Sequence, residues 1–332
     1  MARQQIASFF CRVEDRAILE RVEFYAQDIR ILRELNFRVD VATTPRELRR
    51  ADLYFGWWWT WGFVPAVYAR ARRRPMVLTG VFDEWAFGAR SLSERVLHRL
   101  SLAAPSANVF VSRFEYDRVP RSFHVTRPEY CPLTVDVERY RPAGARGEFL
   151  LCVAGSGMHR GNARRKCMDE LMRAFALVAQ RGFRGELVIV GRKGSDQRWL
   201  DDVVRELGIG DRVRFTGVIS LDEKIDLLQR CALYLQPSRF EGFGQSILEA
   251  MACGAAVVSS PVGAVPELLG SAGTMADGTD PHDIAEKVLA LLADRPHATR
   301  LGMEGRGRAE THFPHARRRD FMAGLIDSLM AP

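Results

Sequence analysis

The chain has 332 residues, of which 47% are hydrophobic and 27% charged, and a formal net charge of +7. This length suggests about two domains, and this composition is typical of a globular protein with real cores. No uninterrupted apolar run approaches the ~20 residues that a membrane-spanning helix needs, so a membrane-spanning protein is not expected. No nucleic-acid-binding module is recognisable, so nucleic acid is not an expected partner.

The N-terminus and the cysteines indicate a cytoplasmic protein. Arg3, Gln4 and Gln5 precede only a short apolar run, which differs from a secretory signal peptide. The six cysteines form no C-x-x-C pair, so we expect reduced thiols in the core. Peripheral contact with the inner face of the membrane is an alternative that the basic charge leaves open.

The first 140 residues alternate short apolar runs with helical patterns. Expected helices span residues 20–35 and 65–73, and expected strands span residues 6–11, 37–42, 52–56, 76–81 and 108–112. Strands that alternate with helices predict a parallel, doubly wound sheet, whose ligands bind at the carboxyl ends of the strands.

A tryptophan-rich segment, residues 57–61, follows the third expected strand. We expect two of its tryptophans in the core and Trp58 and Trp61 on the surface, where aromatic faces stack on sugar rings or anchor at a lipid interface. The arginines among residues 70–74 form either a solvated helix face or a surface that docks on an anionic membrane. Asp83 follows the fourth strand and either caps the next helix or contacts a ligand.

Residues 142–147, which are rich in Pro and Gly, predict a border between domains. A second alternation begins with a strand at 149–154, and a long loop then leads into a helix from Lys166 to Ala179. The elements that follow are a strand at 187–190, ended by Gly191, Arg192 and Lys193, a strand at 213–218 and a helix at 222–231. A final helix is expected at 313–329.

The most informative segment, residues 239–254, lies between two apolar runs and predicts a strand, a glycine-rich turn, a helix and another strand. Glu241 falls in the turn, and Glu249 falls about two helical turns into the helix. Gly242 and Gly244 lack a Cβ atom, so a ligand can approach the backbone closely. The free amides of residues 244–246 suit an anion such as phosphate, although an ordinary βα turn is the alternative.

Residues 237–254, together with 261–267, resemble the donor-binding signature of glycosyltransferase family 4, in which two glutamates are separated by seven residues as Glu241 and Glu249 are. The resemblance is strong over about residues 148–295 and weaker over the first 140. It implies the GT-B fold, an α/β architecture of two Rossmann-like, doubly wound parallel-sheet domains that face a cleft. The implied parts are an acceptor-binding domain at 1–141, a donor-binding domain at 148–308, and a C-terminal helix at 309–332 that crosses back to the first domain.

The resemblance also implies roles for individual residues. Glu241 would contact hydroxyls of the transferred sugar, and Glu249 would contact the ribose of the nucleotide. Lys166 would neutralise the donor diphosphate. The remaining donor-binding residues would be Gly155, Ser156, Arg192, Lys193, Gly242, Phe243, Gly244, Gln245 and Ser246.

The chain departs from the family pattern at two places. Ser156 stands where the family has an arginine, and we expect Arg160 from the same loop to take that role, with an ordinary solvated arginine as the alternative. The histidine that many relatives carry near the end of the fourth strand is absent, and Asp83 is the expected substitute. Trp58 and Trp61 are the expected acceptor-binding residues.

The implied activity is that of a retaining glycosyltransferase of the hexosyltransferase type. It would move a sugar from a nucleotide-diphosphate sugar, with UDP or GDP as the nucleotide, to a glycan, lipid-linked or small-molecule hydroxyl in polysaccharide or glycoconjugate biosynthesis. No metal-ligand spacing is visible, so no metal cofactor is expected. Three alternatives remain: a sugar-nucleotide epimerase of the same fold, a catalytically weak sugar-nucleotide-binding scaffold, and a basic protein that binds membranes or nucleic acid.

Overall fold

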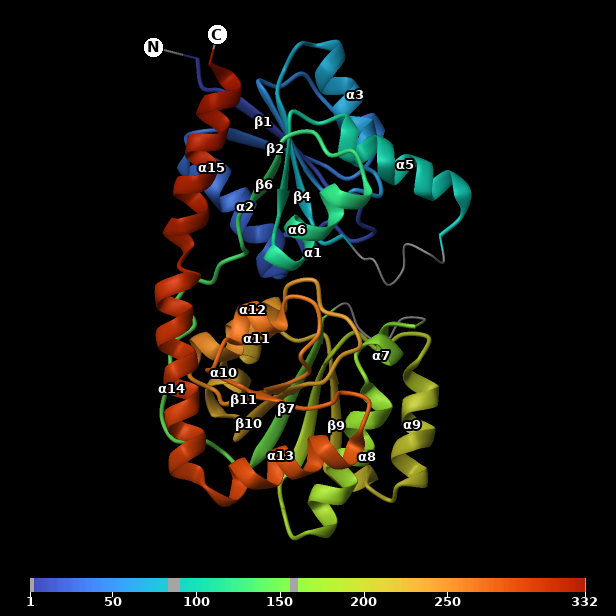
Figure 1. Ribbon diagram of the computed structural model, residues 1–332, viewed down its shortest axis with the longest axis vertical. Helices are drawn as coiled ribbons and strands as arrows, with labels where there is room; N and C mark the ends of the chain where they lie inside the picture. The colour runs from blue at the N-terminus through green and yellow to red at the C-terminus, as the bar shows by residue number, and fades with distance from the viewer. Residues whose placement is uncertain (1–2, 83–89, 156–160, 332) are drawn as a thin grey trace. The chain divides into compact units, whose positions relative to one another are not determined.

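The computed structural model describes residues 3–82, 90–155 and 161–331, so Asp83, Ser156 and Arg160 lie outside the described residues. The chain packs as two compact units, coloured by residue number in Figure 1. Unit 1 comprises Met1–Thr134 together with His315–Pro332, and unit 2 comprises Val135–Pro314. Each unit is built on its own six-stranded sheet.

The sheet of unit 1 is entirely parallel, with the strand order β2-β1-β3-β4-β5-β6. The strands are β1 (Ile6–Phe10), β2 (Arg38–Ala42), β3 (Leu53–Trp57), β4 (Met76–Gly80), β5 (Ala107–Phe110) and β6 (Pro128–Tyr130). The first five match the strands expected from the sequence, and β6 is an additional, three-residue edge strand. β3 and β4 are buried along their whole length, as strands covered on both faces should be.

Helices follow the strands of unit 1 in alternation (Figure 1). They are α1 (Ile18–Arg21), α2 (Glu23–Glu34), the 3-10 turn η1 (Pro45–Glu47), α3 (Phe63–Ala71), α5 (Leu92–Ala103), α6 (Arg113–Ser122) and the C-terminal α15 (His315–Met330). The single helix expected at residues 20–35 is two helices, because Val22 takes an extended conformation between α1 and α2. α2 ends close to the expected residue, where Asn36 takes the left-handed conformation with φ +64°. α15 packs beside α2 within unit 1, so the last helix of the chain does return to the first sheet as expected.

The sheet of unit 2 is also parallel, with the order β12-β11-β10-β7-β8-β9. Its strands are β7 (Phe149–Gly155), β8 (Glu186–Gly191), β9 (Val213–Gly217), β10 (Leu233–Gln236), β11 (Val257–Ser259) and β12 (Thr274–Met275). Parallel strands joined by helices define a doubly wound α/β sheet, which confirms the predicted fold class of each half.

The helices of unit 2 cover both faces of this sheet. They are α7 (Asn162–Arg165), α8 (Met168–Gln180), α9 (Gln197–Glu206), η2 (Gly210–Arg212), α10 (Leu221–Arg230), α11 (Gln245–Ala252), α12 (Val265–Leu269), α13 (Pro281–Ala293) and α14 (Arg295–His312). α8 and α13 lie side by side and bury Met172, Phe175 and Val288 against the strands. The core of unit 2 therefore fixes the strand ends on which its loops are built.

The first helical segment of unit 2 differs from the prediction. The helix predicted from Lys166 to Ala179 is two helices, because Cys167 takes a left-handed conformation with φ +48° between α7 and α8. Lys166 therefore lies in the break between two helices and not at a helix start.

Residues 135–147 belong to unit 2, although the sequence placed the domain borders at 141 and 148. Arg306 donates from Nη1 to the carbonyls of Val137 and Ala252, and Arg146 donates to the carbonyls of Leu228 and Cys253. These two arginines attach the segment to unit 2 by backbone hydrogen bonds that have no sequence signature.

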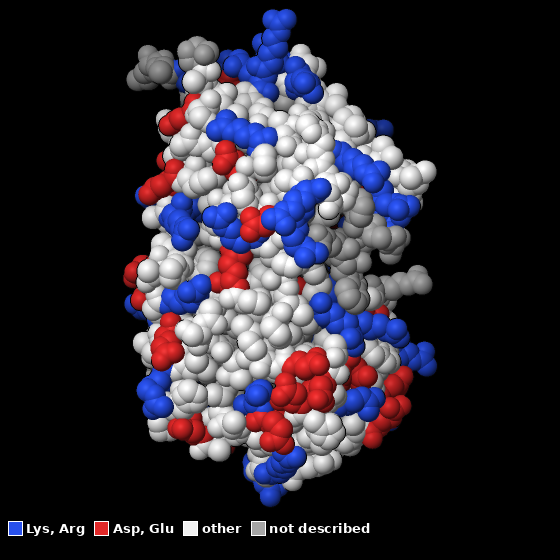
Figure 2. All heavy atoms as spheres, viewed as in Figure 1, with Lys and Arg blue, Asp and Glu red and all other residues white. Residues whose placement is uncertain are grey.

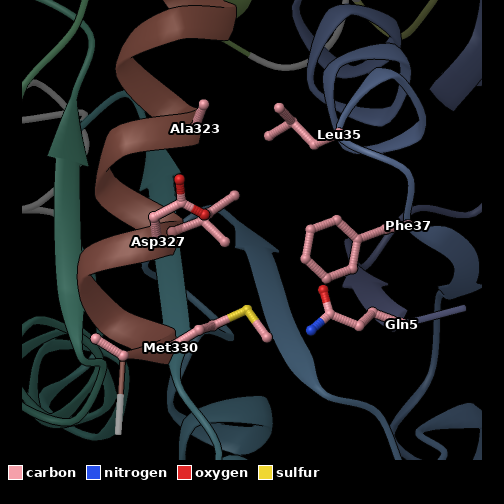
Figure 3. Close-up of a pocket in the computed structure, with 8 residues that line it drawn as sticks. Gln5, Leu35, Phe37, Ala323, Asp327 and Met330 are labelled. Carbon is pink, nitrogen blue, oxygen red and sulfur yellow. The ribbon is translucent and has the colours of Figure 1, made fainter. Parts of the chain in front are cut away.

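A hollow of about 330 Å³ lies on unit 1 between α15 and the starts of the first two strands (Figure 3). Gln5 and Phe37, which immediately precede β1 and β2, line it together with Ile326, Asp327 and Met330 of α15. It is at the amino ends of the strands, whereas ligands of parallel sheets bind at the carboxyl ends. The candidate site is therefore elsewhere.

Among the described residues, no helix is both long and apolar enough to cross a membrane.

Candidate functional site

The predicted donor signature forms a tight turn between β10 and α11. Gly244, the residue just before α11, has φ +95°, and a Cβ atom there would lie 3.1 Å from Leu268 and 3.2 Å from Ile247. Gly263, from the segment after β11, packs so closely that a Cβ atom would lie 2.0 Å from the carbonyl oxygen of Glu241. Both glycines are needed because the turn is compressed against its neighbours. The first amides of α11, at residues 245 and 246, consequently emerge at the carboxyl end of the sheet.

Glu241 is the centre of a buried polar cluster. Its Oε2 atom forms an ion pair with Nζ of Lys166 and accepts a hydrogen bond of 2.8 Å from Nε2 of Gln236. Gln236, the last residue of β10, also accepts a hydrogen bond of 2.7 Å from Oγ of Ser246. The cluster therefore links the end of β10, the break between α7 and α8, and the first turn of α11.

The electrostatics of this cluster favour an ionised Glu241. Burial alone would raise the pKa of the Glu241 carboxyl, but the charges of Lys166 and Arg165 outweigh it and hold that pKa below its ordinary value. Burial lowers the pKa of the Lys166 ammonium, and the charge of Glu241 opposes this shift. A buried, paired carboxylate and ammonium suit a site that later receives another anion, since Lys166 can then be shared.

Arg165 holds the α7–α8 break in place next to the signature. Its guanidinium donates to the carbonyl of Phe240 at 3.0 Å and to Oδ1 of Asn162 at 2.9 Å. The amide of Arg239 donates to the carbonyl of Arg165 at 2.8 Å, and the Arg239 side chain pairs with Glu170. Sequence reasoning did not assign Arg165 a role, because its contact with the signature is to the backbone carbonyl of Phe240, 75 residues away.

Glu249, the second signature glutamate, has its own partners. It is 2% exposed, and both of its carboxylate oxygens accept hydrogen bonds of 2.9 Å from Nζ of Lys224 in α10. The hydroxyl of Tyr140 donates to Oε1 of Glu249 at 3.3 Å, and the same tyrosine ring lies beneath the Lys224 ammonium. Neither Lys224 nor Tyr140 was identified from the sequence, which offers no local signal for either contact.

The other expected donor-binding residues have less defined surroundings. Gly155 ends β7 and pairs with Gly191 at the end of β8. Arg192 and Lys193 follow β8 at the same carboxyl edge, and neither forms an ion pair or hydrogen bond with a residue that the structure describes. Gly242 and Phe243 are buried within the turn.

The tryptophan segment of unit 1 lies at the carboxyl ends of β3 and β4. Trp57 and Trp59 are buried, and their indole N–H groups donate to Asp28 and to Asn108. Trp58 and Trp61 are partly exposed, and Arg12 lies 3.8 Å from the Trp61 ring centre.

Trp58 has an unusual backbone. Its φ of +74° is rare for a bulky residue, and its indole N–H donates to the Tyr25 hydroxyl at 2.6 Å. Such strain persists only where the surroundings impose it, and it is concentrated at functional sites.

No group of three His, Cys, Asp or Glu side chains within residues 3–82, 90–155 and 161–331 is arranged to hold a metal ion. Among the described residues, the positive groups at the carboxyl end of the unit 2 sheet include Lys166, Arg165, Arg192 and Lys193, together with the amides of α11. This arrangement can hold an anion between a helix terminus and side-chain cations.

Comparisons with known proteins agree with this geometry. A family model described as "Glycosyl transferases group 1" matches residues 149–294. The MMP alpha-(1->4)-mannosyltransferase of Mycolicibacterium hassiacum is 30% identical over 258 residues, which cover 75% of this chain and 58% of the relative. A GDP-mannose-dependent alpha-(1-6)-phosphatidylinositol monomannoside mannosyltransferase of Mycolicibacterium smegmatis is 33% identical, with 71% of this chain and 66% of the relative covered. The chain thus spans about three-fifths of the length of these relatives.

Solved structures share the fold over nearly the whole chain. Sucrose-phosphate synthase from Thermosynechococcus elongatus has a TM-score of 0.82 at 18% identity, covering 99% of this chain and all of that one. HepE from Anabaena, solved with UDP and glucose, has a TM-score of 0.82 at 18% identity, covering 98% of this chain and all of that one. These neighbours have the GT-B fold that the sequence predicted. The fold, the signature geometry and the match over residues 149–294 agree, and the chain belongs to the glycosyl transferases group 1 family.

Proposed function

We propose that the protein is a retaining glycosyltransferase that moves a sugar from a nucleotide-diphosphate sugar to an acceptor hydroxyl. The observation that carries this proposal is the buried Glu241–Lys166 pair at the start of α11, with Glu249 on the same helix. The cluster offers a carboxylate for sugar hydroxyls, a cation for the diphosphate and a second carboxylate for the ribose. Membership of the family supports assigning these roles together.

The chemistry follows from where negative charge develops. As the bond between sugar and diphosphate breaks, the leaving phosphate becomes more negative, and Lys166 with the α11 amides would stabilise it. Arg160 is the proposed second cation. A phosphate oxygen of the leaving group would take the proton of the acceptor hydroxyl on the same face, which retains the configuration of the sugar. These groups would act in place of a metal ion.

The donor is proposed to be GDP-mannose, with a UDP-hexose as the second candidate. Two of the relatives above are named as mannosyltransferases, and one of them as GDP-mannose-dependent. An O-antigen chain mannosyltransferase of Escherichia coli is a third, at 37% identity over 47% of this chain. HepE was solved with UDP and with UDP-glucose, and this supports a UDP-hexose as the second candidate donor.

The acceptor is proposed to bind at the carboxyl end of the unit 1 sheet. Trp58 and Trp61 are partly exposed there, and stacking on a sugar ring would use their faces. Asp83 is proposed to contact the acceptor or the donor sugar. A cytoplasmic role in polysaccharide or glycoconjugate biosynthesis, with peripheral membrane contact, fits a glycan or lipid-linked acceptor.

A nucleotide screen tests the proposal directly. A ligand that binds only the folded protein raises its melting temperature by mass action, so GDP, UDP and ADP and their sugar conjugates should give one selective shift. The preferred conjugate is then incubated with and without acceptors. Transfer to an acceptor supports the proposal, whereas epimerised donor without acceptor indicates an epimerase, and binding without any turnover indicates a scaffold. No shift with any nucleotide contradicts the proposal.

A further inference from the structure

One helix of unit 1 turns its apolar side chains away from the protein. α5 buries His98, Ser101 and Leu102, whereas three other apolar residues face outward: Leu92, Val96 and Leu100 are 70%, 44% and 39% exposed. These three are spaced four residues apart, so they form one stripe along the helix. A surface helix normally shows the reverse pattern, with its apolar stripe toward the core.

The concentration of exposed apolar residues on α5 is not shared by the rest of the described chain. Of the six large hydrophobic residues exposed there, these three lie on α5, and a fourth, Val67, lies on α3, which packs beside it. Scattered exposed apolar residues are ordinary, but a contiguous set marks an interaction surface.

The attachment of α5 to the protein does not depend on the stripe. The hydroxyl of Ser101 accepts a hydrogen bond of 2.8 Å from the amide of Phe63, and the His98 ring meets Phe82 edge to face. Ser91 and Glu94 form a reciprocal capping box at the start of the helix. These inner and terminal contacts hold the helix, so its outer face is free to serve another purpose.

The charges beside the stripe are positive. Arg95 and Arg99 each precede an outward apolar residue by one position, and neither forms an ion pair with a residue that the structure describes. Arg95 is half-buried, and Arg99 is exposed, with its guanidinium 5.9 Å from the centre of the Phe123 ring. Glu94, the one acidic residue of α5, is two positions from both Leu92 and Val96 and therefore lies on the other side of the helix. Figure 2 shows blue side chains bordering white surface in the region where α5 lies in Figure 1.

An apolar stripe with an arginine edge on one short helix fits a specific kind of surface. A helix of twelve residues is ~18 Å long, too short to span a bilayer but suited to lying in its headgroup region. The arginines would meet lipid phosphates while the aliphatic side chains reach the acyl boundary. We propose that α5 docks on an anionic lipid bilayer through Leu92, Val96 and Leu100, with Arg95 and Arg99 on lipid phosphates.

This surface is distinct from the tryptophan segment and the arginines of residues 70–74 that the sequence suggested for membrane contact. It also stands whether or not the transfer reaction is as proposed, because it involves no residue of the donor site. A second copy of the chain or another protein would be a different occupant, and the experiment separates them.

The test is sedimentation of the full chain with vesicles. Vesicles of phosphatidylglycerol and phosphatidylcholine in equal parts are compared with pure phosphatidylcholine, at low and at physiological salt. We expect the wild-type protein to sediment with the anionic vesicles, less so at the higher salt. The triple variant Leu92→Ser, Val96→Ser, Leu100→Ser should bind at least ~10-fold more weakly, because it loses most of the buried apolar area.

A charge variant and matched controls complete the design. Arg95→Gln with Arg99→Gln should weaken binding and flatten its salt dependence. Arg184→Gln with Arg300→Gln removes two exposed arginines of unit 2, and Met303→Ser removes an exposed apolar residue of unit 2, so both should bind as wild type does. Circular dichroism melting of every variant checks that the chain still folds.

Three outcomes would overturn the proposal. The wild-type protein could stay in the supernatant with both kinds of vesicle. The triple variant could bind as tightly as wild type, which would put the membrane surface elsewhere. Sedimentation equilibrium could instead show a dimer that the triple variant dissolves in the absence of lipid, which would assign the stripe to a second copy of the chain.

Discussion

At the scale of single residues, Glu241 is the side chain on which the proposed chemistry depends most. Glu241→Gln keeps the shape and the contact with Gln236 but removes the charge that Lys166 now faces. We expect turnover with the preferred donor to fall on the order of 100-fold while nucleotide affinity changes little, since the amide would no longer orient the sugar hydroxyls as a carboxylate does. Steady-state kinetics with isothermal titration of the free nucleotide separates the two effects.

The control for that prediction is Glu170→Gln. Glu170 pairs with Arg239 close to the signature and has no proposed contact with the sugar. If Glu170→Gln lowers turnover as much as Glu241→Gln does, the effect is a general loosening of the turn, and the assignment of Glu241 to the sugar is contradicted.

The ion pair between Glu249 and Lys224 should affect both the affinity for nucleotide and the free energy of unfolding. Lys224→Met leaves a carboxylate that is 2% exposed without its cation, so the free energy of unfolding should fall by about 3 kcal/mol. Adding Glu249→Gln removes the uncompensated charge and should recover part of that loss. Glu249→Gln, alone or together with Lys224→Met, should bind nucleotide at least ~10-fold more weakly.

Denaturant unfolding of the wild type, both single variants and the double variant gives the coupling energy between the two residues. Additive losses of stability would mean that the observed ion pair contributes nothing in solution. Unchanged nucleotide affinity in Glu249→Gln would contradict the proposed contact between Glu249 and the ribose.

The sequence predicted the signature glutamates and Lys166 because they belong to a local pattern with a known spacing. It could not predict Lys224, Tyr140, Gln236 or Arg165 as partners. The contacts of Lys224 and Tyr140 with Glu249 join residues 25 and 109 positions apart, and they depend on how α10 and residues 135–147 pack against α11. Such contacts become visible only when the fold is known.

At the scale of elements, the start of α11 is held by a conformation that only glycine adopts at low cost. Gly244→Ala would place a Cβ atom 3.1 Å from Leu268 at a φ of +95°, so we expect unit 2 to lose about 1–3 kcal/mol of stability. The matched control is Gly307→Ala in the interior of α14, where nothing lies within 4 Å. That change should be neutral or stabilising by up to about 1 kcal/mol, because alanine favours helix. Equal effects of the two changes on the denaturation midpoint would contradict the argument.

Helix α5 supplies a prediction about pH. Burial, assisted by the charge of Arg90, lowers the pKa of His98 to about 4 from an ordinary value of 6.5. Between these values the unfolded chain binds a proton that the folded chain does not, so stability is complete above pH 6.5 and falls as the pH drops toward 4.

His98→Gln should therefore make stability less dependent on pH in that window, measured as the denaturation midpoint at a series of pH values. His124→Gln, at an exposed position of the same unit, should leave the pH profile as it is in the wild type. A profile for His98→Gln as steep as that of wild type would show that other groups control the acid sensitivity.

Element by element, the sequence gives strands more reliably than helices in this chain. Five strands of unit 1 were predicted because each is a short apolar run between turn signals, whereas β6 has only three residues and no such pattern. α14 was not predicted, since its interior carries Gly302, Gly305 and Gly307. The structure explains why glycine is present at position 302. A Cβ atom there would lie 2.1 Å from the carbonyl oxygen of Gly254, so glycine allows α14 to pack closely against the end of α11.

At the scale of the whole molecule, the chain leaves unit 1 and returns to it at its C-terminus, and one buried arginine secures the return. Arg318 of α15 is fully buried and pairs with Asp28 of α2, at 2.7 Å from Nε to Oδ1 and 3.0 Å from Nη2 to Oδ2. It also donates to the carbonyl of Cys131, just before the chain enters unit 2. Asp28 in turn accepts from Trp57 at the end of β3, so the pair joins α15 to the tryptophan segment.

Arg318→Met should therefore destabilise unit 1 selectively. The change leaves Asp28 buried without its cation, which should cost about 3–5 kcal/mol. Units with separate cores can unfold in separate steps, so calorimetry should show a lower transition for unit 1, while the transition that rises with added nucleotide stays in place. Adding Asp28→Asn should restore part of the loss, and Arg319→Met, at the partly exposed neighbouring position, should have little effect. If the nucleotide-sensitive transition fell together with the other, the two units would unfold as one, and the selective role of Arg318 in unit 1 would be wrong.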